Sequence, residues 1–98
     1  MVELKEYKGK LISKVGGKGT QSEGPEYFLE LSKPNDFGQT ELGVMKNAHL
    51  WQEDSMLHPF LNKIVIITGE PVIIKRTNFD GTVKIESIDP KEIKENIL

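Results

Sequence analysis

Short runs of β-branched, aromatic and leucine residues alternate with polar residues along the chain, and stretches rich in Gly, Pro, Asn and Ser separate them. Because alternate side chains of a strand lie on opposite faces, each run predicts a strand with one face turned towards a core. The predicted strands span residues 7–14, 26–32, 40–45, 64–76 and 82–88. The side chains that we expect to be buried are Leu11, Tyr27, Leu29, Leu31, Val44, Ile66, Val83 and Ile85.

The fourth run contains Gly69 and Pro71, which predict a bend in a long strand. Proline has no N–H to donate, so we expect Pro71 at a sheet edge or a bulge. The polar turn at residues 77–81 joins this strand to the fifth one. Residues 62–88 therefore predict the closing hairpin of a small β-barrel.

A helix is predicted between the third and fourth strands. Asn47 can act as its N-cap, and apolar residues follow at roughly helical spacing over residues 48–57. Pro59 should end or kink this helix, because proline is not tolerated in a helix interior. We expect Trp51 on this helix, packed against the barrel.

Two further segments are predicted from their capping, proline and glycine residues. Asp89 as N-cap and Pro90 at the first helical position predict a short helix or a tail over residues 90–98. Residues 16–24 carry several glycines and no apolar side chain, which predicts a mobile loop.

Composition narrows the class of protein. The 98 residues predict one domain, 1–98, with a barrel over about 5–89. The absence of cysteine excludes disulfides, thiolate zinc sites and a cysteine nucleophile. The charged segment 1–6 lacks the features of a secretory signal, and the longest apolar run, 64–67, is too short to span a bilayer. We therefore expect a cytoplasmic protein with no membrane partner.

The order strand, loop, strand, strand, helix, strand, strand points to a known architecture. The segments that carry the resemblance are 7–12, 27–31, 61–70 and 83–85. This all-β chain resembles the oligonucleotide/oligosaccharide-binding (OB) fold, a five-stranded Greek-key barrel with a helix between its third and fourth strands. An SH3-like barrel is the main alternative, and the helical segment favours the OB-like one.

The resemblance implies a ligand groove on the outer face of strands two and three, flanked by the first and last inter-strand loops. Single-stranded nucleic acid in such a groove requires stacking rings and basic side chains. The residues expected to serve that role are Lys10, Lys14, Phe28, Lys75, Arg76, Phe79 and Lys84. The alternative role for Phe28 is packing beneath a loop or the C-terminal helix.

Charge opposes this interpretation in part. Residues 1–18 carry a net charge of +3, residues 19–60 carry −5, and residues 61–98 are neutral. Acidic residues near the expected groove would repel phosphates at close range. They are Glu23, Glu26, Glu30 and Glu41.

No catalytic constellation is visible, so we expect neither an enzyme nor a cofactor. His49, Glu53, Asp54 and His58 are the only cluster of metal-ligand type, and solvated histidines are the simpler explanation. The first function hypothesis is a non-catalytic module for single-stranded DNA or RNA. The alternative is a protein-interaction or assembly module that uses a strand edge or the Phe28–Met45 face. Enzymatic or sugar-binding activity has the least support.

Overall fold

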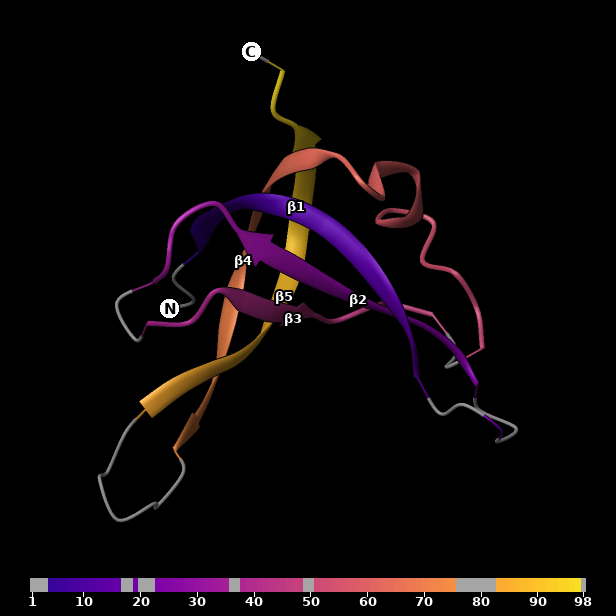
Figure 1. Ribbon diagram of the computed structural model, residues 1–98, viewed down its shortest axis with the longest axis horizontal. Helices are drawn as coiled ribbons and strands as arrows, with labels where there is room; N and C mark the ends of the chain where they lie inside the picture. Colours follow the sequence, from indigo (N-terminus) through magenta and orange to yellow (C-terminus); the bar gives the residue numbers. More distant parts are fainter. Residues whose placement is uncertain are drawn as a thin grey trace.

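The fold is seen in a computed structural model (Figure 1) that describes residues 4–16, 19, 23–35, 38–48, 51–75 and 83–97. At positions 16, 73–75 and 83–86 this description covers the backbone only.

Five strands close into a barrel in the order β1-β2-β3-β5-β4 (Figure 1). Their bounds are β1 Lys5–Gly16, β2 Gly24–Leu31, β3 Glu41–Val44, β4 Ile64–Lys75 and β5 Val83–Glu95. Neighbouring strands are antiparallel except β3 and β5, which are parallel. The all-β, five-stranded, OB-like barrel expected from the sequence is confirmed.

The core lies inside the barrel. Leu11, Tyr27, Leu29 and Val44 are buried as predicted. Leu31 is half-buried and packs against the core. Among the side chains that the structure describes, the other buried apolar ones are Leu42, Leu57, Val65, Ile67 and Ile88.

The prediction that Ile66 is buried is wrong. Ile66 lies opposite Lys8 of β1 and Lys94 of β5, on the outer face of the barrel. Its neighbours Val65 and Ile67 are fully buried instead. The side chains of Val83 and Ile85 are outside the described part of the structure.

The predicted bend in β4 is present at Gly69. The pairing of β4 with β5 shifts register between Thr68 and Gly69, and again between Val72 and Ile73. A Cβ atom added at Gly69 would lie 2.8 Å from Ile88 Cγ2 and 3.0 Å from the carbonyl carbon of Asp89. Glycine is needed here because the two backbones approach too closely for any side chain.

The predicted α-helix between β3 and β4 is wrong. The described residues of this connection form turns and one short 3₁₀ helix, η1 (His58–Phe60). Pro59 lies in the first turn of η1, where its missing N–H costs nothing, and does not end a longer helix. Trp51 is 59% exposed and not packed in the core as expected.

The predicted C-terminal helix is also wrong, because β5 continues to Glu95. Residues 90–95 pair with 65–69 of β4, and Ile93 lies opposite Ile67 and packs against the core. The first half of β4 therefore has a neighbouring strand on each side, β1 on one and the end of β5 on the other. None of the helical segments that the structure describes is long and apolar enough to cross a membrane.

Candidate functional site

The outer face of β1, β2 and β3 presents an uncharged row of side chains across the strands. Ile12 lies opposite Phe28, Phe28 opposite Gly43, and Gly43 opposite Ser87 of β5. Ile12 and Phe28 are both half-buried. We call these four residues the central row.

A hollow of about 330 Å³ lies over one end of the central row. Phe28, Gly43, Met45, Lys46 and Ser87 are among the residues that line it. Gly43 has no side chain to fill the space, and glycine within a strand often marks a place where a ligand approaches the backbone closely. Met45 is 47% exposed beside the hollow.

Lys14 covers the ring of Phe28. Its Nζ atom lies 4.6 Å from the ring centroid, within the range of a cation–π interaction. The same amine donates a 2.7 Å hydrogen bond to Glu41 Oε1, so it bridges the ring and a carboxylate on β3. Both charged side chains remain well exposed, which limits the pair to about 0–1 kcal/mol.

Charged residues flank the central row on both sides. On one side Lys10 lies opposite Glu30, and Glu30 lies opposite Glu41. On the other side Lys14 lies opposite Glu26. These flanking rows hold two amines and three carboxylates, a net charge of −1. The sheet itself therefore does not form a basic groove.

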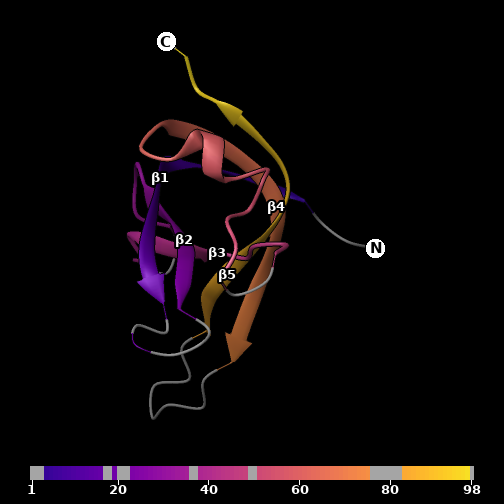
Figure 2. The ribbon, with the colours of Figure 1, turned by 90° about the vertical axis from the view of Figure 1, so that its right-hand side faces the viewer.

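The structure brings three of the predicted site residues, Lys10, Lys14 and Phe28, onto this one face. Lys75 ends β4 opposite Val83, and Lys84 lies near the start of β5 opposite Ile74. In Figure 2 this end of the hairpin and the β1–β2 end lie on the same side of the barrel. The side chains of Lys75 and Lys84, and all of Arg76 and Phe79, fall outside the described residues, as do most of residues 16–24 and their predicted mobility.

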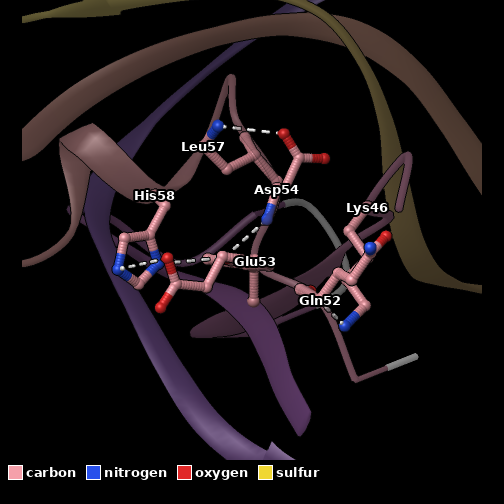
Figure 3. Close-up of polar contacts among 7 residues, drawn as sticks. Lys46, Gln52, Glu53, Asp54, Leu57 and His58 are labelled. Carbon is pink, nitrogen blue, oxygen red and sulfur yellow. Dashed lines mark hydrogen bonds and ion pairs between the residues drawn. The ribbon is translucent and has the colours of Figure 1, made fainter. Parts of the chain in front are cut away.

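A polar cluster lies in the β3–β4 connection (Figure 3), and it gives Glu53, Asp54 and His58 roles that the sequence pattern did not reveal. Asp54 is 3% exposed, and its carboxylate accepts hydrogen bonds from the backbone N–H groups of Asn47, Met56 and Leu57 at 2.7, 2.8 and 3.1 Å. The available signal was Asp54 itself, because an Asp side chain commonly accepts hydrogen bonds from the backbone N–H groups two and three residues later.

Tyr27 links this cluster to the barrel. Its hydroxyl accepts a 3.0 Å hydrogen bond from Asp54 N–H and lies 3.1 Å from His58 Nδ1. Which of the two groups donates the proton depends on the tautomer of His58. Nε2 lies 3.5 Å from Glu53 Oε2 (Figure 3). The cluster anchors the connection rather than offering a reactive group.

Burial raises the pKa of the Tyr27 hydroxyl above its ordinary value of 10.0. Desolvation is the main cause; the bond from the Asp54 backbone lowers the pKa in part, and the charges of Asp54 and Glu53 raise it further.

A raised folded-state pKa means that the folded protein holds the proton of the Tyr27 hydroxyl more tightly than the unfolded chain does. We predict that this contribution to stability is complete below about pH 10 and is lost as the pH rises further. Denaturant unfolding measured at several alkaline pH values checks this, because Tyr27→Phe should remove that part of the decline.

Two described members of the suggested metal cluster are bound to other partners. Asp54 is committed to backbone donors and His58 to Tyr27. His49 is outside the described residues. Within the described ranges, no group of three or more potential protein ligands is arranged to hold a metal ion.

Comparison with known proteins does not add an assignment: no family model matches the chain, and neither a curated protein nor a solved structure resembles it significantly. The site must therefore be interpreted from its own chemistry.

Proposed function

We propose that this protein binds short single-stranded nucleic acid across the outer face of β2 and β3. The observation that supports this most directly is the pairing of an aromatic ring, Phe28, with the amine of Lys14 beside an open hollow. A nucleotide combines a flat ring with a phosphate, so it offers one partner to each group.

Binding requires an exchange at Lys14. A phosphate that takes the amine from Glu41 draws it away from the Phe28 ring, and the ring becomes available for base stacking. The exchange is inexpensive because an exposed ion pair contributes only about 0–1 kcal/mol. The hollow over Gly43 provides room for the edge of the stacked base.

The net charge of −1 on the flanking rows limits affinity. Additional cations would come from the ends of the strands, where the chain carries Lys75, Arg76 and Lys84. We expect a dissociation constant in the range of non-specific binding, roughly 10⁻⁴–10⁻⁶ M, which weakens as salt rises because phosphate contacts release counterions.

The test is fluorescence anisotropy with mixed-sequence DNA and RNA strands of about 12 nucleotides in low salt. Phe28→Ala should reduce affinity by about 1–3 kcal/mol, the value of one base stack. Glu41→Gln should increase affinity, because it removes the competitor for Lys14 and one negative charge. Ile97→Ala is the matched control, since it truncates an 81% exposed apolar side chain beyond the end of β5. Unchanged affinity for the oligonucleotide in both Phe28→Ala and Glu41→Gln would contradict the proposal.

A protein partner is the second candidate, and the flanking rows favour it. An uncharged centre surrounded by compensating lysines and glutamates has the composition of a small protein interface with a polar rim. Such a partner would depend on salt less steeply than an oligonucleotide does, and Glu41→Gln would weaken its binding by removing a charge complement. Absence of any oligonucleotide-induced NMR shift on β2 and β3 would leave this candidate in place.

A further inference from the structure

A second hollow, of about 470 Å³, lies at the opposite end of the β1–β2 pairing from the Gly16–Gly24 end. Its apolar part is formed by Tyr7 and Leu31, which are half-buried and pack against the core. Leu31 is three residues from Phe28 along β2, or about 10 Å. The second hollow is therefore separate from the central row. Its volume falls within the usual range of small-molecule sites.

The polar rim of this hollow is basic. Lys8, Ser32 and Lys33 are among its lining residues, and Glu6 is the only acidic residue among those lining residues that the structure describes. Neither Lys8 nor Lys33 forms an ion pair with any residue in the described part of the chain. Both residues are exposed, so an anion in solution can reach them.

The walls of the hollow are held by backbone bonds. Ser32 N–H donates to Lys8 O at 3.1 Å, and Leu31 N–H donates to Thr40 O at 2.8 Å. The adjoining turn is closed by Asn35, whose N–H donates to Gln39 O and whose Oδ1 accepts from Gln39 N–H. A site built on paired backbone needs little ordering when a ligand binds.

We propose that this hollow binds a small phosphomonoester that carries a flat apolar ring. Two lysines match the charge of a monoester, which is about −1.5 to −2 at neutral pH. The ring lies against Tyr7 and Leu31, while the phosphate meets Lys8, Lys33 and the Ser32 hydroxyl. This site is independent of the proposed nucleic-acid face and uses none of its residues.

The test is a ¹⁵N–¹H NMR titration with phenyl phosphate at pH 7.5, compared with inorganic phosphate, benzyl alcohol and benzoate. Phenyl phosphate should shift the amide signals of Tyr7, Lys8, Ser32 and Lys33 in a saturable way in the millimolar range. Inorganic phosphate and benzyl alcohol each lack one half of the ligand and should bind about tenfold more weakly or not at all. The affinity for benzoate, a monoanion with a flat ring, should lie between that for phenyl phosphate and that for benzyl alcohol.

Charge variants locate the site. Lys8→Gln and Lys33→Gln should each weaken binding of phenyl phosphate by about five- to tenfold, the loss of one exposed charge-assisted contact. Glu6→Gln should strengthen binding. Lys94→Gln is the matched control, because Lys94 is an exposed lysine on the barrel that does not line the hollow.

Four outcomes would overturn the proposal. The first is the absence of a saturable shift at these residues. The second is equal binding of inorganic phosphate and phenyl phosphate, which would mean that the apolar floor is not used. The third is an equal loss in Lys94→Gln, which would indicate diffuse attraction to a basic surface. Shifts confined to Phe28, Gly43 and Ser87 would assign the ligand to the nucleic-acid face and would equally reject this site.

Discussion

Replacement of Leu29 by alanine should lower the free energy of unfolding by about 2–5 kcal/mol. Leu29 is fully buried on β2, opposite Leu11 on one side and Leu42 on the other, both of which are also buried. Truncation removes apolar contacts and leaves a cavity that three paired strands cannot easily collapse. Chemical denaturation followed by circular dichroism measures the change.

The control for Leu29 is Val15→Ala, which truncates a side chain that is 63% exposed at the end of β1. Its effect should stay within about 0.5 kcal/mol, as for surface substitutions in general. Similar losses in the two variants would mean that β2 does not run through the centre of the core.

Replacement of Asp54 by alanine should cost about 2–4 kcal/mol, because three backbone donors lose their charged acceptor in a buried setting. The amide protons of Asn47, Met56 and Leu57 should then exchange faster with solvent than in the unchanged protein. Hydrogen-exchange NMR and denaturant unfolding together measure both effects.

Two variants separate the acceptor role of Asp54 from its charge and its position. Asp54→Asn keeps one oxygen for Met56 and Leu57 but turns an NH₂ donor towards the N–H of Asn47, so it should lose stability to an intermediate extent. Glu53→Ala removes a neighbouring carboxylate whose side chain is 64% exposed, and it should have little effect. An Asp54→Ala variant as stable as Glu53→Ala would show that the connection is held by its apolar contacts alone.

The strands of the barrel were predictable because alternation of apolar and polar residues is a local property of the chain. In β1 and β2 the pattern placed Leu11, Tyr27 and Leu29 inward correctly. The run 64–67 is apolar on both faces, so its own pattern does not determine which residues are buried. The pairing with β1 decides which residues of this run point into the core, since Val65 lies opposite the buried Gly9 and Ile66 opposite the exposed Lys8.

The two helix predictions failed where tertiary contacts outweighed local signals. Residues 48–57 carry helical spacing, but the carboxylate of Asp54 takes the backbone donors of Asn47, Met56 and Leu57. Asp89 and Pro90 have the form of a helix start, yet the open side of β4 requires a pairing strand, and β5 extends to supply it. In both cases unpaired backbone or buried polar groups would cost more than the local helix preference contributes.

The sequence by itself determined an all-β barrel and the outward position of Phe28, since both depend on the period of two within single strands. Only the tertiary structure decided what surrounds Phe28. Lys14 and Glu41 are 27 positions apart, and they meet because the register of three neighbouring strands brings them over one ring. Register depends on the packing of all the strands around a shared core, so no single segment of the chain encodes it.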